Sequence, residues 1–281
     1  MVDNSGGQVP GREVVSHLLV PSGGQCWRCQ SRPASTGEHK FKRANLSRLM
    51  KPGDLLLWGD GEKLHEIRGK SGVNRDRYGV VKFPKSMCEP CNNQYSREFD
   101  LAYDKYSVYI ESTWVRVAPG FNLHEVYGEG WAKDALNLAR YFAKHFGCRM
   151  AKDGIPIPAS LREFLAGATD MPDARMSIIS TDSIHRNYGK GMSISPNYVW
   201  TDDDGTRFTG MVAAAYVRSI GVRYEWQVEG IPDELRSQFF DYPYPVINFF
   251  RDDDDMARGI TRKPGRFARF MQWANTPPGT R

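Results

Sequence analysis

Apolar residues recur every three or four positions in two stretches in the middle of the chain. The first stretch carries Tyr95, Phe99, Ala102, Tyr106 and Ile110, and the second carries Trp131, Ala135, Leu138, Phe142 and Phe146. Side chains three and four positions apart share one face of a helix. The pattern therefore predicts one helix over 92–112 and a second helix from 131 to near Gly147.

Short apolar runs between Gly, Asp and Pro clusters are typical of strands. The sequence predicts a hairpin from two such runs, 55–58 and 64–67, and further strands over 79–83, 113–117, 177–180, 198–201, 207–217, 223–228 and 245–250. Helical segments are predicted over 40–48 and 267–273, and Ser160-x-x-Glu163 has the spacing of a capping box for a short helix. The predicted fold class is α+β, with a helical segment followed by a β-rich C-terminal region.

The composition agrees with a folded globular protein, because 40% of the 281 residues are hydrophobic and 12% are aromatic. The longest apolar run, 211–217, is far shorter than the ~20 residues that cross a bilayer. The N-terminal segment also lacks the basic and apolar regions of a signal peptide. We therefore expect a soluble, cytoplasmic protein without membrane association.

Positive charge gathers in one third of the chain. Residues 26–97 hold 15 basic and 7 acidic side chains, hence a net charge of +8, whereas the whole chain carries +5 and the remainder −3. Such a concentration favours a polyanionic partner such as nucleic acid, with a solubilising surface as the alternative. The candidate phosphate contacts in this region are Lys40, Lys42, Arg43, Arg48 and Arg97.

Four of the five cysteines occur as two pairs, Cys26-x-x-Cys29 and Cys88-x-x-Cys91. In a cytoplasmic protein this spacing indicates metal binding rather than disulfides. Four thiolates close a tetrahedral zinc site with no open position, so the predicted zinc ion is structural. The fifth cysteine, Cys148, is interpreted as a small buried hydrophobic residue.

Candidate ligands of a divalent metal ion and a candidate general base lie close to the two cysteine pairs in the sequence. Glu38 and His39 follow the first pair, and Asn92 follows the second pair directly. Carboxylate and amide oxygens suit Mg²⁺ or Mn²⁺, and an imidazole is a natural base near neutral pH. A zinc ion that joins the two pairs would bring these residues together, although Asn92 could instead cap the helix that follows.

The order of these motifs resembles the HNH (ββα-metal) endonucleases, in particular their zinc-containing, endonuclease VII-like branch. The resemblance covers 26–112: a Cys-x-x-Cys pair, an acidic residue before His, and a second pair followed by Asn at the start of a helix. It implies that His39 is the general base, that Glu38 and Asn92 hold one catalytic Mg²⁺ or Mn²⁺, and that DNA is cleaved to a 5′-phosphate and a 3′-hydroxyl.

The chain also departs from the family pattern. Lys42 stands where many relatives have Pro, and the Asn that orients the base has only Asn45 and Asn74 as candidates. A catalytically degenerate, zinc-stapled nucleic-acid-binding protein is therefore the alternative function. A third interpretation assigns the function to the C-terminal β region, acting on a protein partner.

Together these patterns predict four parts. They are an N-terminal arm over 1–25, a zinc-stapled ββα-metal module over 26–115, a helical connector over 116–168 and a β-rich region over 169–281. A homodimer is compatible with this organisation. Asp100 and Asp104 are spaced i, i+4 on the first predicted helix, with Arg97 one turn earlier, which indicates ion pairing within the helix. A supporting role behind the metal ligands is the alternative.

Overall fold

A computed structural model describes residues 15–20, 24–49, 55–59, 64–68, 81–113, 120–180, 192–218, 220–233, 238–241, 243–248 and 250–251. The helices are α1 (Arg43–Leu49), α3 (Glu89–Asn92), α4 (Arg97–Thr113), α5 (Leu123–Tyr127), α6 (Trp131–Asp153) and α7 (Ala159–Ala166), with short 3₁₀ turns η1 (Ser16–Leu18), η2 (Gln94–Ser96) and η4 (Gly128–Gly130). Within these ranges, no helix is both long enough and apolar enough to cross a membrane.

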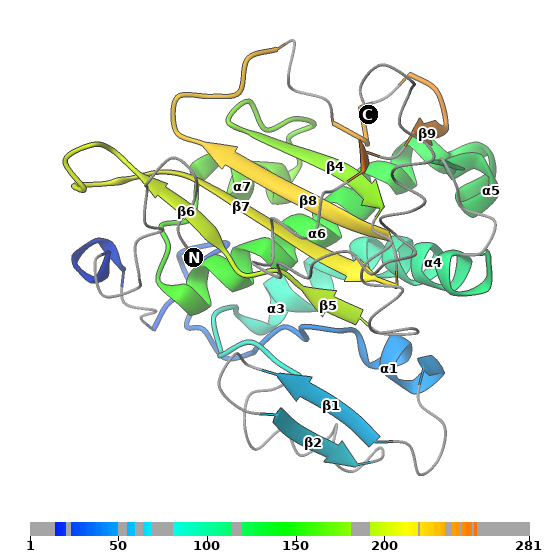
Figure 1. Ribbon diagram of the computed structural model, residues 1–281, viewed down its shortest axis with the longest axis horizontal. Helices are drawn as coiled ribbons and strands as arrows, with labels where there is room; N and C mark the ends of the chain where they lie inside the picture. The colour runs from blue at the N-terminus through cyan, green and yellow to red at the C-terminus, as the bar shows by residue number, and fades with distance from the viewer. Residues whose placement is uncertain are drawn as a thin grey trace, which may run out of the picture.

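The strands form one large sheet and two small ones. They are β1 (Leu55–Gly59), β2 (Leu64–Arg68), β3 (Gly120–Asn122), β4 (Ala174–Ser180), β5 (Met192–Ile194), β6 (Tyr198–Thr201), β7 (Phe208–Val217), β8 (Ile220–Gln227), β9 (Val246–Asn248) and β10 (Phe250–Arg251). The large sheet has the order β10-β4-β8-β7-β5, and β6 also pairs with β7. All its pairings are antiparallel except that of β10 with β4. The predicted α+β class, with helices before a C-terminal β region, is confirmed (Figure 1).

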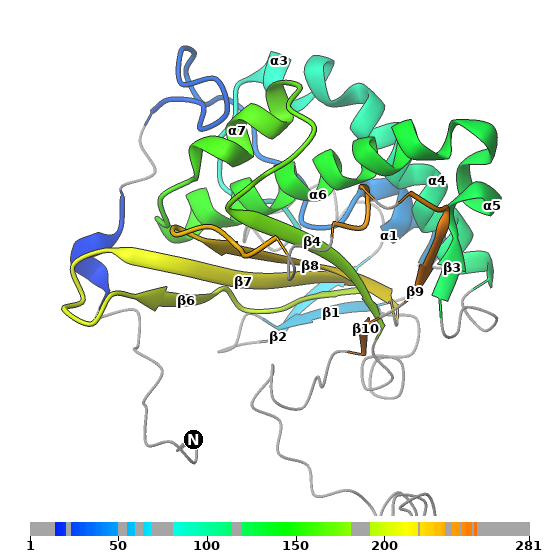
Figure 2. The same ribbon diagram turned by 90° about the horizontal axis from the view of Figure 1, so that it is seen from above.

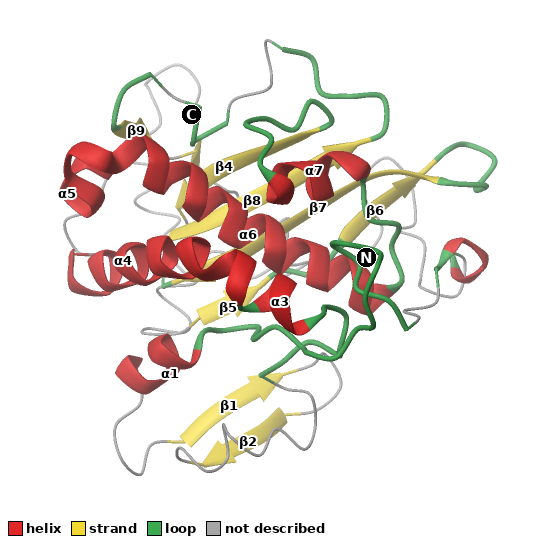
Figure 3. Ribbon diagram, turned by 180° about the vertical axis from the view of Figure 1, so that it is seen from behind, coloured by secondary structure: helices red, strands yellow, loops and turns green. Residues whose placement is uncertain are grey.

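Helices α6 and α7 cover one face of the large sheet, and α3 lies on the far side of α6 from the sheet (Figure 2). Seen from behind, α4 and α6 run side by side, with α3 close to the start of α4 (Figure 3). The antiparallel hairpin β1–β2 stands apart from the large sheet, as its own two-stranded sheet.

The middle of α6 is buried on all sides, since every residue from Tyr141 to Met150 is inaccessible to solvent. On the sheet side, the ring of Phe146 stacks on Tyr224 of β8 with a centroid distance of 5.2 Å. On the other side, the Tyr141 ring stacks on Tyr103 of α4 at 3.9 Å. One continuous apolar core therefore includes the cysteine-bearing segments, the long helices and the large sheet. The predicted four-part division stays a prediction.

Several predicted elements differ from the structure in their ends. The helix predicted over 92–112 is divided into the end of α3, the turn η2 and α4, and α6 continues six residues beyond Gly147, to Asp153. The capping-box prediction is wrong, because α7 has Pro158 as its N-cap and Ser160 lies inside the helix with a buried, unpartnered hydroxyl. Of the strand predicted over 113–117, Thr113 ends α4, while 114–117 and the predicted helix over 267–273 lie outside the described residues.

Candidate metal centre and active site

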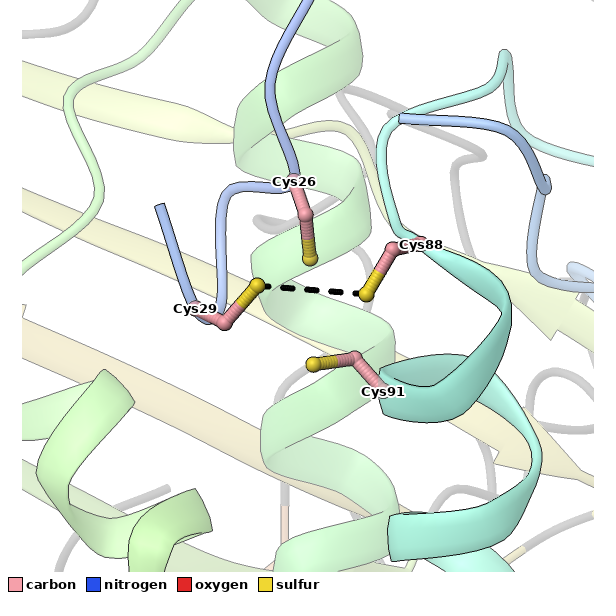
Figure 4. A group of neighbouring side chains, drawn as sticks. All are labelled: Cys26, Cys29, Cys88 and Cys91. Atoms are coloured by element: carbon pink, nitrogen blue, oxygen red, sulfur yellow. Dashed lines mark hydrogen bonds between the residues drawn. The ribbon is translucent and has the colours of Figure 1, made fainter. Parts of the chain in front are cut away.

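The four paired cysteines converge in space, as their spacing predicts. Their sulfur atoms all lie within 4.8 Å of one another, and the Cys29 and Cys88 sulfurs are 3.8 Å apart (Figure 4). In the described part of the chain, no other group of three or more His, Cys, Asp or Glu side chains gathers in this way. Four sulfur donors are a set that zinc favours, so this cluster could hold a zinc ion.

Local backbone structure orients the side chains of the two cysteine pairs toward each other. The first pair lies in a tight turn in which the Gln30 amide donates to the Cys26 carbonyl at 2.8 Å, and Gln30 adopts a left-handed φ of 54°. In the second pair, Cys88 is the N-cap of α3 and Cys91 is in its only turn. Arg28 joins the pairs, because its guanidinium donates to the Cys91 carbonyl at 2.9 Å and to the Leu165 carbonyl of α7 at 2.6 Å.

The thiols differ in how readily they lose a proton. Burial acts to raise the pKa of Cys29, but hydrogen bonds with Ser31 outweigh it and bring the pKa to about 6. Burial raises the pKa of Cys91, and hydrogen bonding with Cys88 adds to this effect. A bound metal ion would have to displace the remaining thiol protons, so its affinity would fall as the pH falls.

Two extended segments lead from one cysteine pair to the other. Segment 36–40 runs antiparallel to 81–87 through bridges between Thr36 and Met87 and between His39 and Lys82. The Phe83 amide donates to the Glu38 carbonyl at 2.8 Å, within this pair of segments. Because α3 begins at Glu89, after its N-cap Cys88, the chain forms two antiparallel extended segments followed by a helix, with α1 and the β1–β2 hairpin inserted between the two segments.

Glu38 and Asn92 meet at a buried lysine of α6. The Lys144 ammonium lies 3.0 Å from the Glu38 carboxylate, 3.3 Å from the Asp100 carboxylate and 3.4 Å from the main-chain carbonyl of Asn92. The Lys144 side chain is only 1% exposed. The structure thus places the carboxylate of Glu38 and the main-chain carbonyl of Asn92, the two predicted ligands of a divalent ion, on the same buried lysine. His39, which follows Glu38 in the sequence, is half-buried.

The charges in this cluster depend on one another. Burial acts to lower the pKa of Lys144, but the carboxylates of Glu38 and Asp100 more than offset this, and its pKa is raised. Burial raises the pKa of Asp100, with Lys144 opposing that change. The lysine is therefore positively charged at neutral pH and stabilises two carboxylates that would otherwise repel each other.

Asn92 does not serve as an N-cap, so that interpretation was wrong. It is the last residue of α3, whose N-cap is Cys88. Its side-chain oxygen is buried and has no hydrogen-bond partner among the described residues. A buried amide oxygen without a partner is costly, and it is free to bind a cation.

The predicted intrahelical pairs of Arg97 with Asp100 and Asp104 are also wrong. Asp100 binds Lys144, and the Asp104 carboxylate lies 2.7 Å from the ammonium of Lys42. Both carboxylates of α4 therefore bind lysines from other elements and tie those elements to the helix. Asp100 thus contacts the same lysine as Glu38, and the alternative role behind metal ligands stays a prediction.

The five predicted phosphate contacts occupy different environments. Arg48 pairs with Glu111 at 2.6 Å and Lys42 with Asp104, so both charges are already compensated within the protein. Lys40 lies over the Phe83 ring at 5.9 Å. Arg43 and Arg97 are exposed.

Of the two candidates for the orienting asparagine, Asn45 is buried in α1, where its amide donates to Glu111 of α4 at 3.1 Å. Its side-chain oxygen has no partner in the described ranges. Asn74 lies outside the described residues.

Sequence patterns did not single out Lys144. The predicted apolar face of the second helix runs through Leu138, Phe142 and Phe146, and Lys144 is off that face. A charged residue there indicates exposure to solvent when only one face of a helix is buried, but the middle of α6 is buried on all sides. The available signal was the apolar run Tyr141-Phe142-Ala143 directly before Lys144, which suggests a helix with partners on more than one side.

Among known proteins, no family model, no curated protein and no solved structure matches this chain.

Proposed function

We propose that this protein is a metal-dependent DNA endonuclease of the HNH type. The observation that carries the proposal is that the cysteine cluster fixes Asn92, the residue after Cys91, against the same buried Lys144 that binds Glu38. The order of two antiparallel extended segments followed by α3 supports it, because it follows the ββα order of that family.

The proposed roles follow from the chemistry of each side chain. His39 accepts a proton from the attacking water, which requires a neutral imidazole near pH 7. Glu38 and Asn92 supply hard oxygen donors for Mg²⁺ or Mn²⁺, and the buried, unpartnered amide oxygen of Asn92 fits that role. When bound, the ion would offset the charge that develops on the phosphate and the leaving 3′-oxygen. The cysteines would hold zinc in a structural role.

DNA binding is proposed to rest first on the exposed cations. Arg43 and Arg97 are exposed, whereas Lys42 and Arg48 would have to exchange carboxylates of α4 for phosphates. Phosphate contacts position DNA without reading its sequence. Replacement of Arg43 or Arg97 by Gln should therefore weaken binding to all sequences alike and reduce the dependence of affinity on salt.

Cleavage of supercoiled plasmid in Mg²⁺ or Mn²⁺ tests the proposal, with His39→Ala as the inactive variant. Loss of the general base should slow cleavage by ~10²–10⁴-fold. His124→Ala is the matched control, because His124 is half-exposed on α5 and pairs with Glu129. Equal cleavage by wild type and His39→Ala would remove His39 from the mechanism.

The ion pair between Lys144 and Glu38 favours a second candidate, a catalytically degenerate, zinc-stapled nucleic-acid-binding protein. A carboxylate that already binds an ammonium at 3.0 Å has less capacity for a divalent ion. This candidate predicts DNA binding that weakens steeply with salt, with no turnover in any divalent ion. Detectable nicking that is lost in His39→Ala would exclude it.

A further inference from the structure

Lys144 lies where oxygen atoms from three different elements converge. Its ammonium contacts the carboxylate of Glu38 from the extended segment, the carboxylate of Asp100 from α4 and the main-chain carbonyl of Asn92 from α3. All three contacts are between 3.0 and 3.4 Å. Such a set of oxygens would attract a metal ion, but here it surrounds a cation that belongs to the protein.

Other charged groups close to this cluster are already engaged. The Lys42 ammonium binds the Asp104 carboxylate at 2.7 Å and the main-chain carbonyl of Asp100 at 2.8 Å. The next residue of α6, His145, donates to the Lys40 carbonyl at 3.0 Å, and burial lowers its pKa to about 3, so it is neutral. With both carboxylates ionised, the net charge of Glu38, Asp100 and Lys144 is therefore −1, whereas it would be −2 without the lysine.

We infer that Lys144 is a tethered cation of the candidate hydrolytic centre, which positions Glu38 and Asp100 and limits how tightly a divalent ion binds there. This inference rests on the proposed function, because it takes Glu38 and Asn92 as the ligands of that ion. The lysine is a positioning residue, since it acts on Glu38 rather than on the DNA.

Lys144 affects the binding of a divalent ion in two opposite ways, and we infer that the second is the larger. The ammonium keeps two carboxylates close together before any metal ion arrives, which lowers the cost of organising the site. It also repels an incoming divalent ion, because like charges a few ångströms apart in a partly buried site interact strongly. A purely structural lysine would have the opposite effect on metal affinity, because its loss would disorder Glu38 and weaken metal binding.

Mn²⁺ binding to the zinc-loaded, full-length protein, followed by electron paramagnetic resonance, tests this inference without relying on activity. Lys144→Gln removes the charge and keeps a hydrogen-bond donor, and Lys144→Met is a second neutral variant that keeps the apolar stem. Both should lower the Kd for Mn²⁺ by about tenfold or more. Lys144→Arg keeps the charge and should bind Mn²⁺ within a few-fold of wild type.

Two control variants locate the effect. Lys152→Gln removes the same charge from a half-exposed position on the same helix, and it should leave the Kd unchanged. Glu38→Gln should raise the Kd if the ion binds at this cluster. Unchanged or weaker Mn²⁺ binding in both neutral variants would overturn the inference, and so would unchanged binding in Glu38→Gln. Plasmid cleavage by His39→Ala tests the proposed function separately, so the two failures can be told apart.

Discussion

The two sides of α6 are held together by different forces. On one side, β4, β7 and β8 form a regular antiparallel ladder whose inner face is almost wholly apolar. On the other side, the segments around the cysteine pairs contain little regular structure, and they meet through thiols, a buried lysine and single hydrogen bonds. Burial of apolar area therefore stabilises the sheet side, whereas the candidate site is held by buried charges that depend on one another and by a thiol cluster that could bind a metal ion.

Helix α6 packs against both the sheet and the cysteine-bearing segments, and adjacent residues of the helix contact one or the other. Phe146 stacks on Tyr224 of the sheet, while Gly147 leaves room for the ring of Trp27 in the first cysteine pair. A substitution of Phe146 therefore tests the packing against the sheet, and a substitution of Gly147 tests the packing against the first cysteine pair.

Loss of the metal ion should have the largest effect, and it should be confined to the site side. In Cys88→Ala, the amides of 24–40 and α3 should exchange hydrogen much faster than in wild type, because bound zinc contributes of order 10 kcal/mol to the folding of small zinc modules. The amides of β7 and β8 should stay protected. Hydrogen exchange followed by mass spectrometry measures both regions at once.

Cys148→Ala is the matched control, because Cys148 is buried beside Met87 but is not in the cysteine cluster. It should leave exchange in 24–40 close to that of wild type. Equal loss of protection in β7 and β8 of Cys88→Ala would contradict the division into two differently stabilised sides.

Removing the aromatic contact on the sheet side should lower global stability. Phe146→Ala leaves a cavity against Tyr224 and should reduce the free energy of unfolding by about 3–5 kcal/mol. Phe146→Leu keeps most of the volume and should cost clearly less. Urea unfolding followed by circular dichroism measures the difference, and equal midpoints for Phe146→Ala and wild type would refute the packing role of this ring.

An added methyl group at Gly147 should disturb the cysteine side with a smaller effect. A Cβ at this position would lie 2.3 Å from the Trp27 ring, so Gly147→Ala should cost about 1–3 kcal/mol through overpacking. Gly130→Ala, at the N-cap of the same helix, meets no atom within 4 Å and should be nearly neutral. If both variants show the same unfolding midpoint in urea, the close approach of the Trp27 ring does not make a side chain at position 147 destabilising.

The smallest predicted effect depends on pH. Burial lowers the pKa of His145 from its ordinary value of 6.5 to about 3. Above pH 6.5 the imidazole is neutral in both the folded and the unfolded chain, so it adds no pH dependence. Below pH 6.5 the unfolded chain binds the proton and the folded chain does not, so stability falls as the pH falls toward 3.

Between pH 7 and pH 5.5 this residue should lower the free energy of unfolding by about 1.3 kcal/mol. His145→Gln keeps a donor for the Lys40 carbonyl and lacks the titration. Its stability should fall less than that of wild type over the same interval in urea unfolding at the two pH values. The same pH dependence in both proteins would show that His145 does not contribute it.

Periodic apolar patterns predicted much of the fold because they record which face of an element is buried. The hairpin β1–β2 and the strand β6 were predicted to within one residue at each end, and the long helices α4 and α6 were predicted with one end of each misplaced by five or six residues. The cysteine cluster was predicted because metal ligands have a characteristic spacing along the chain. The break between α3 and α4 was not predicted, because the apolar spacing in the sequence runs back to Tyr95 in η2, whereas that side chain is 49% exposed in the structure.

The candidate site was predicted only in part, because its contacts join residues that are far apart in the sequence. Glu38 and Asn92 could be paired in advance through the cysteine motif, but their common partner Lys144 lies on a helix with no motif of its own. Asp100 and Asp104 were assigned to their own helix because spacing reveals only local partners. Their actual partners depend on how α4 packs against α6 and the extended segments.

Binding of one metal ion by the four cysteines is what would join the segments that carry Glu38 and Asn92. Native mass spectrometry of protein purified without chelator should detect one zinc ion per chain in wild type and in Cys148→Ala, and none in Cys88→Ala. A wild-type chain that binds no zinc, or a Cys88→Ala chain that retains it equally well, would contradict the proposal that a metal ion joins the two segments carrying Glu38 and Asn92.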